Sequence, residues 1–212
     1  MKSTHEILLE AKQAAPALRN LTSKQKNRAL ECMADALVSH CDEILAENEK
    51  DVAAARGKIS DVMIDRLSLN EARVHAMADG MRAVAALPDP VGQELSRVER
   101  ENGMTIRKVS VPLGVVAIIY ESRPNVTSDA AALAIKAGSA CVLRGGKEAY
   151  GSAHAILTAL RDGLKKAGLP ETAVGMPEDT TRESARELMT AVGLVDLLIP
   201  RGGAGLIRAC VE

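Results

Sequence analysis

Two short segments of this 212-residue sequence combine glycines with cations, which is the composition that a phosphate group needs. They read Arg144-Gly145-Gly146-Lys147 and Pro200-Arg201-Gly202-Gly203-Ala204-Gly205, and each continues an apolar run. Glycine lets the backbone approach an anion closely, free N–H groups bind it, and Arg or Lys adds positive charge. Each segment alone can equally well be an ordinary tight turn. The presence of both segments at one edge of the inferred sheet favours a nucleotide or phosphorylated ligand. Neither matches G-x-G-x-x-G, so the motif does not support an ordinary Rossmann dinucleotide site.

A third segment, from Glu121 to Thr127, offers a different kind of chemistry. Asn125 follows Pro124 near the end of an apolar run, where its amide can donate to a developing oxyanion. The same residue type is more often a turn former. Arg123 can bind a carboxylate or phosphate through two parallel N–H···O bonds, or it can lie exposed.

Apolar runs alternate with helical patterns from residue 113 onward, and this alternation predicts the elements that position the three segments. Strands are predicted at 113–120, 140–143, near 174 and at 195–199, and helices at 128–136, 148–166, 181–192 and after 203. Because the connections have crossover length, the fold class is α/β with a doubly wound, mostly parallel sheet. Ligands bind beyond the carboxyl ends of such strands, so the three segments are expected at one edge.

Residues 1–90 show helical periodicity almost throughout, with capping-box patterns at Ser3/Glu6 and Thr22/Gln25. Further helices are predicted at 42–56 and from about residue 70. Prolines at 88 and 90 indicate a boundary, and residues 91–112 read as a β-hairpin turning at Asn102-Gly103 in a type I′ turn. A lone hairpin is marginally stable, so this one is expected to pack on something else, such as another subunit. The remaining 113–212 form the sheet region.

Composition excludes several classes of function. Lys and Arg number 27 against 28 Asp and Glu, a net charge of −1, which predicts neither nucleic-acid binding nor attachment to an anionic membrane. No stretch reaches the length of a membrane helix, and no metal-site spacing occurs. Widely spaced cysteines fit a reducing, cytoplasmic location; they are Cys32, Cys41, Cys141 and Cys210.

Three runs in this order, VPLGVVAIIYESRPNVT, LRGGKEA and LIPRGGAGLI, resemble the γ-glutamyl phosphate reductase family, also called glutamate-5-semialdehyde dehydrogenase, of the aldehyde dehydrogenase superfamily. The resemblance covers the chain from about Ala11 to Arg208. It implies an aldehyde-dehydrogenase-like cofactor domain, an oligomerisation hairpin and a homo-oligomer. The implied reaction is NADPH-dependent reduction of L-glutamyl 5-phosphate to L-glutamate 5-semialdehyde and phosphate, in proline biosynthesis.

The resemblance also implies roles for individual residues. Asn125 matches the oxyanion-site asparagine, and Arg123 is a candidate for the substrate's phosphate or carboxylate. The loop of Arg144, Gly145, Gly146 and Lys147 matches the one near the adenosine ribose and its 2′-phosphate, which favours NADP(H). Gly202 and Gly203 match the turn near the cofactor pyrophosphate.

The family's nucleophilic cysteine follows the RGGAG motif at a distance, whereas this sequence has only a few residues after that motif. We therefore expect a chain truncated before the catalytic domain. None of the four cysteines has the electropositive, partly exposed setting of a reactive thiolate. The expected consequence is no activity alone; the alternative function is an NADPH-binding or subunit-interaction module.

Overall fold

Helices form most of the first 90 residues, as the sequence predicts. The computed structural model describes residues 2–211, and its first helices are α1 (Thr4–Arg19), α2 (Ser23–Ser39), α3 (Cys41–Ala55), α4 (Asp61–Leu67) and α5 (Glu71–Ala86). Both predicted capping boxes are present, at Ser3/Glu6 and at Thr22/Gln25. The sequence did not predict α4, because seven residues are too few for a helical period to show.

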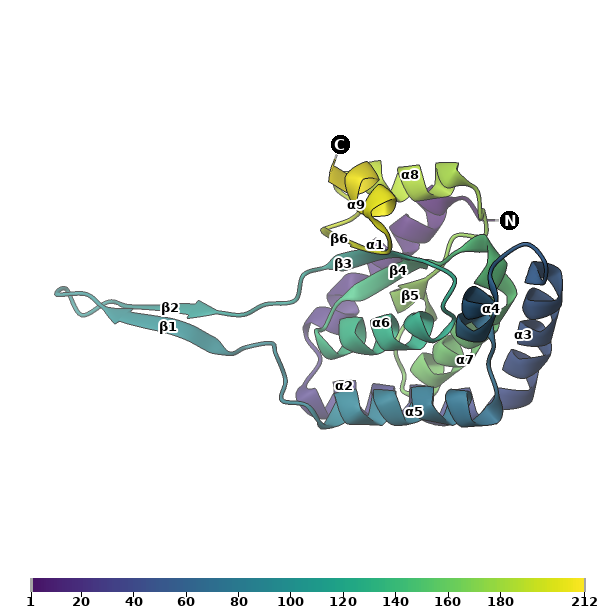
Figure 1. Ribbon diagram of the computed structural model, residues 1–212. Helices are drawn as coiled ribbons and strands as arrows, with labels where there is room; N and C mark the ends of the chain where they lie inside the picture. The colour runs from purple at the N-terminus through teal and green to yellow at the C-terminus, as the bar shows by residue number, and fades with distance from the viewer. Residues whose placement is uncertain (1, 212) are drawn as a thin grey trace.

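The hairpin of β1 (Glu94–Glu99) and β2 (Thr105–Val109) extends far from the body of the molecule, and every residue of both strands is exposed (Figure 1). The predicted type I′ turn is wrong. Gly103 has a φ of 82°, but no residue other than glycine has a positive φ within residues 2–211. Gly103 instead ends a three-residue loop, with its N–H donating to the Arg100 carbonyl at 2.9 Å. The Asn102 side chain accepts the Met104 N–H at 3.1 Å, which stabilises this alternative turn.

The sheet contains β3 (Val115–Tyr120), β4 (Ala140–Arg144), β5 (Val174–Gly175) and β6 (Leu197–Arg201) in the order β5-β4-β3-β6. All three strand pairs are parallel, which confirms the predicted sheet. Each of the six residues of the central β3 is buried. β6 begins two residues later than predicted and includes Pro200 and Arg201. Its residues alternate between exposed and half-buried positions, so the apolar run in the sequence does not mark the ends of the strand.

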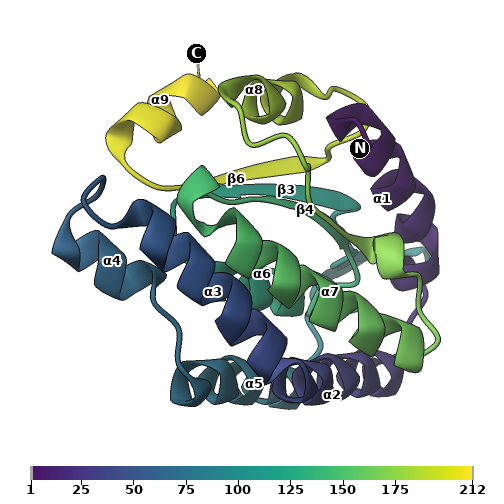
Figure 2. The same cartoon turned by 90° about the vertical axis from the view of Figure 1, so that its right-hand side faces the viewer.

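Helices cover both faces of the sheet, as in a doubly wound fold (Figure 2). α6 (Asn125–Lys136) and α7 (Tyr150–Lys166) lie on one face, with α2 and α5 as a further layer outside them. α1, α8 (Arg182–Thr190) and α9 (Ala204–Val211) lie on the other face. Two short 3-10 turns, η1 (Lys147–Ala149) and η2 (Glu171–Ala173), precede α7 and β5.

The start of α6 differs from the prediction of Ser128 or Asp129 as the cap. Pro124 already has a helical backbone, φ −57° and ψ −36°, and α6 begins at Asn125. Proline suits a helix start because its φ is fixed near the helical value and its missing N–H is not needed there. The Ser128 hydroxyl donates back to the Asn125 carbonyl at 2.8 Å instead of capping the helix.

A buried ion pair joins the base of the hairpin to α2. The Lys26 Nζ donates to both carboxylate oxygens of Asp89, at 2.9 and 3.0 Å, and the Lys26 side chain is 0% exposed. Asp89 also accepts the Ser23 hydroxyl at 2.7 Å and the Val91 N–H at 2.9 Å. The segment that connects α5 to the hairpin is therefore held against α2 at Asp89.

Within residues 2–211, no helix is both long and apolar enough to cross a bilayer. No group of three or more His, Cys, Asp or Glu side chains there is arranged to hold a metal ion.

Candidate active site

The three predicted segments meet at the carboxyl edge of the sheet. In the strand register Ile119 lies opposite Arg144 on one side, and Tyr120 lies opposite Arg201 on the other. The segments that follow β3, β4 and β6 are therefore neighbours, as the parallel topology predicted. Two cavities lie beside the segment that follows β3, and Arg123 lines both.

The first cavity, which we call the β3–β6 crevice, has a volume of about 250 Å³. It lies between the ends of the two strands and is lined by Tyr120, Glu121, Arg123, Val126, Arg201 and Gly202. The Gly203 N–H, at the start of α9, donates to Glu121 Oε1 at 2.8 Å. A Cβ atom at Gly202 would lie 2.9 Å from the same oxygen, so the Glu121 side chain in this position leaves room only for glycine. Sequence reasoning did not single out Glu121 as the partner of this turn.

The Arg144–Lys147 loop is held mainly by contacts within the chain. The Arg144 guanidinium donates to the carbonyls of Gly145, Thr180 and Thr181 at 2.7–2.8 Å, and burial lowers the pKa of Arg144. A Cβ at Gly145 would lie 3.0 Å from the Tyr120 ring, and one at Gly146 would collide with the Ser122 hydroxyl.

Close packing against Tyr120 and Ser122 accounts for the glycines at positions 145 and 146. The terminal nitrogens of Arg144 are already used in hydrogen bonds to backbone carbonyls. The space beside the loop measures only about 10 Å³. Lys147 is exposed, and the Arg144 Nε–H is the one buried side-chain polar atom without a hydrogen-bond partner in residues 2–211. Cofactor binding by Arg144, Gly145, Gly146 and Lys147 stays a prediction.

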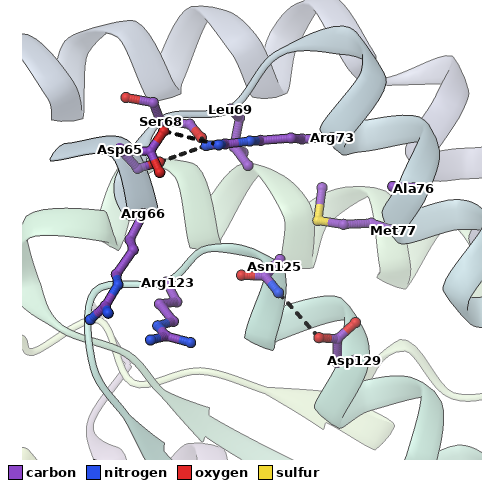
Figure 3. A pocket seen from close by; sticks show the side chains of 10 residues that line it. All are labelled: Asp65, Arg66, Ser68, Leu69, Arg73, Ala76, Met77, Arg123, Asn125 and Asp129. Atoms are coloured by element: carbon purple, nitrogen blue, oxygen red, sulfur yellow. Dashed lines mark hydrogen bonds and ion pairs between the residues drawn. The ribbon is translucent and has the colours of Figure 1, made fainter. Parts of the chain in front are cut away.

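The second cavity, which we call the Asn125 pocket, has a volume of about 390 Å³ and lies between α6 and the α4–α5 connection (Figure 3). Its lining comprises Asp65, Arg66, Ser68, Leu69, Arg73, Ala76, Met77, Arg123, Asn125 and Asp129. Sequence reasoning found Arg123 and Asn125 but missed the other eight. No motif links residues 65–77 to residues 123–129, because they approach each other only in the fold.

Arg73 fixes the wall of the Asn125 pocket. Its guanidinium donates to Asp65 Oδ1 at 3.0 Å and to the carbonyls of Asp65 and Ser68 at 2.6 Å each. These bonds tie the last turn of α4 to the first turn of α5. Asp65 and Arg73 therefore neutralise each other and hold the connection that faces Asn125.

The Asn125 amide Nδ2 donates to Asp129 Oδ2 at 3.2 Å, one helical turn further along α6. Burial raises the pKa of the Asp129 carboxyl, and the Arg201 charge and the Asn125 hydrogen bond partly oppose this rise. An amide nitrogen carries two hydrogens, so Asn125 retains one for a ligand.

None of the cysteines lines either cavity in the part of the chain that the structure describes. Cys141 is fully buried in β4, and burial raises the pKa of its thiol to about 12. Burial also raises the pKa values of Cys41 and Cys210. A nucleophilic thiolate needs the opposite shift.

Residues 2–198 match the sequence model of the aldehyde dehydrogenase family, and the chain belongs to this family. Within it, the chain is similar to gamma-glutamyl phosphate reductases, which confirms the resemblance seen in the sequence. It is 57% identical to the one from Streptococcus suis, over 99% of this chain and 51% of the relative.

Crystal structures of two such reductases share the fold. The protein from Thermotoga maritima has a TM-score of 0.96 at 39% identity, covering 99% of this chain and 51% of that one. The protein from Saccharomyces cerevisiae has a TM-score of 0.89 at 30% identity, covering 99% and 54%. The chain thus spans about half the length of the relatives it matches.

Proposed function

We propose that this chain supplies the cofactor crevice and part of the substrate pocket for NADPH-dependent reduction of L-glutamyl 5-phosphate to L-glutamate 5-semialdehyde and phosphate. One observation carries this proposal: two cavities at the carboxyl edge of the sheet share Arg123. One lies at the start of a helix, and the other presents a side-chain amide. The names of the similar reductases support the same reaction.

The residues fit a nicotinamide dinucleotide in most respects. The β3–β6 crevice offers the Arg201 guanidinium and the N-terminus of α9, which together favour a pyrophosphate. The exposed Lys147 and the unpartnered Arg144 Nε–H lie on the loop assigned to the adenosine end. The Glu121 carboxylate conflicts with an anion there, because it already accepts the Gly203 N–H. Glu121 must turn away for the pyrophosphate to take that N–H.

In the Asn125 pocket, the free hydrogen of the Asn125 amide donates to the acyl oxygen as negative charge develops on it. Arg123 binds the departing phosphate, because a guanidinium matches it with two parallel hydrogen bonds. The reaction requires a thiolate that attacks the acyl carbon and displaces phosphate, giving a thioester. When bound, the nicotinamide cofactor would supply the hydride for reducing the thioester, which releases the aldehyde and returns the thiolate.

A second function is favoured by the positions of the cysteines. Since none of them lines the β3–β6 crevice or the Asn125 pocket, residues 2–211 by themselves are expected to bind cofactor without forming the thioester. In this interpretation the chain acts as an NADPH-binding module. It pairs with further copies through the apolar side chains of the hairpin, which include Val98 and Ile106. The expected cytoplasmic location is part of the same proposal.

Titration of NADPH fluorescence with the purified chain tests cofactor binding. We expect saturable binding that is stronger for NADPH than for NADH, and Lys147→Gln is expected to weaken the binding of NADPH more than that of NADH. No saturable change with either nucleotide would refute the cofactor crevice. The chain is also expected not to oxidise NADPH with glutamyl phosphate generated in situ. Turnover comparable to that of a complete reductase would overturn this expectation.

A further inference from the structure

We propose that Asp129 recognises the ammonium group of the substrate, so that the Asn125 pocket selects an amino-acid acyl phosphate over one without the amino group. This inference rests on the proposed function and assigns a specificity-determining residue to the same pocket. Neither the sequence motifs nor the comparisons point to Asp129.

Five charged side chains face the pocket, and two of them, Asp65 and Arg73, are paired with each other. Arg66 and Arg123 make no hydrogen bond or ion pair with the other residues drawn in Figure 3. Asp129 accepts only the 3.2 Å bond from Asn125 among those residues. Two cations and one anion therefore remain for a ligand.

This set complements the charges of a glutamyl phosphate. The molecule carries two anionic groups, the α-carboxylate and the phosphate, and one cation, the α-ammonium. Two guanidiniums suit the anionic groups, since each can bind a carboxylate or phosphate with two hydrogen bonds. The carboxylate that remains, Asp129, is the group that suits the ammonium.

The setting of Asp129 supports this role. Its carboxylate has about four lone-pair positions, and the Asn125 amide uses one. It is half-buried, and a desolvated carboxylate gains from a cationic partner because burial penalises the unpaired charge. Arg201 lies near enough to favour the charged form but makes no ion pair with Asp129.

The bond between Asn125 and Asp129 also couples recognition to positioning. Residues four apart lie on the same side of a helix, so both side chains face the pocket from α6 (Figure 3). An ammonium bound by Asp129 would therefore lie at a fixed distance from the amide that faces the acyl oxygen. The affinity of the pocket should therefore depend on the number of carbon atoms between the ligand's amino group and its acyl carbon.

Calorimetric titration with two stable phosphonates tests the proposal. L-2-amino-6-phosphonohexanoate has the chain length of glutamyl phosphate and carries the ammonium, whereas 6-phosphonohexanoate lacks it. We expect the native chain to bind the amino compound at least about tenfold more tightly, since hydrogen bonds between charged groups are the strong ones. Asp129→Asn keeps the shape of the side chain but removes its charge, and it is expected to abolish this preference.

Asp61→Asn is the matched control. It removes one negative charge from an exposed carboxylate on α4 that does not line the pocket, so the preference for the amino compound should survive. Thermal unfolding of each variant establishes that it is folded. Equal binding of the two phosphonates by the native chain, or an unchanged preference in Asp129→Asn, would overturn the role of Asp129 alone. If neither compound binds the native chain, the proposed function fails and this inference fails with it.

Discussion

Replacing Lys26 by methionine tests how firmly the hairpin is joined to the body of the protein. The substitution keeps most of the buried stem but removes the ammonium that donates twice to Asp89. Breaking a buried ion pair by deleting one partner costs about 3–5 kcal/mol. Asp89 keeps its bonds from Ser23 and Val91 and is 14% exposed, so the lower end, about 3 kcal/mol, applies. For a chain of this size that lowers the melting temperature by roughly 6–12 °C.

Urea unfolding followed by circular dichroism measures the loss, with the exposed Lys24→Met on the same helix as control. The control should change the free energy of unfolding by less than about 0.5 kcal/mol. Combining Lys26→Met with Asp89→Asn should cost less than the sum of the two single changes, because the second removes the charge that the first leaves unpaired. A loss below about 1 kcal/mol for Lys26→Met would refute the reasoning.

The stability that the Lys26–Asp89 pair contributes is also expected to depend on pH. Burial acts to raise the pKa of Asp89, but hydrogen bonds from Ser23, Lys26 and Val91 outweigh it and hold the pKa below the ordinary value of 3.8. A carboxyl with a lowered folded-state pKa contributes stability above its unfolded pKa, and this contribution is lost as the pH falls through the folded value. The difference between the native chain and Lys26→Met should therefore shrink below pH 4, measured as urea midpoints.

Two further predictions concern ligand and partner. Glu121→Gln removes the charge next to the Gly203 N–H and should tighten NADPH binding about threefold to fivefold at low salt in fluorescence titrations; weaker binding would contradict the conflict seen at that turn. Ile106→Lys, on the exposed apolar side of the hairpin, should reduce the oligomer size found by light scattering, whereas the adjacent Thr105→Lys on the opposite side should not. A native chain that is monomeric at high concentration would contradict the second expectation.

Local chemistry explains why much of the fold could be predicted. The capping boxes at Ser3 and Thr22 and the buried run that became β3 are determined by residues close together in the sequence. The turn at Asn102-Gly103 shows the limit of such rules. Its position was right, but the Asn102 side chain selects a different turn by bonding to the Met104 N–H.

The candidate site was predicted only where it follows strand ends. Asn125 and Arg123 could be found because a parallel sheet brings such segments to one edge. The opposite wall of the Asn125 pocket comes from α4 and α5, and its residues carry no signature of their own. Composition favours an anion-binding role for Gly145, whereas the structure also shows a tight contact between this position and the Tyr120 ring, which sequence rules do not predict.

The packing of Tyr120 against Gly145 also has a spectroscopic consequence. The sequence contains two tyrosines and neither tryptophan nor phenylalanine. Tyr120 lines the β3–β6 crevice and donates or accepts a hydrogen bond with Thr127 at 2.7 Å, and Tyr150 lies beside Gly145 and Gly146. Both phenols thus flank the loop assigned to the adenosine end of the cofactor. The ultraviolet emission of the native chain comes from these two rings alone, so its quenching reports directly, without any attached dye, on what enters that edge of the sheet.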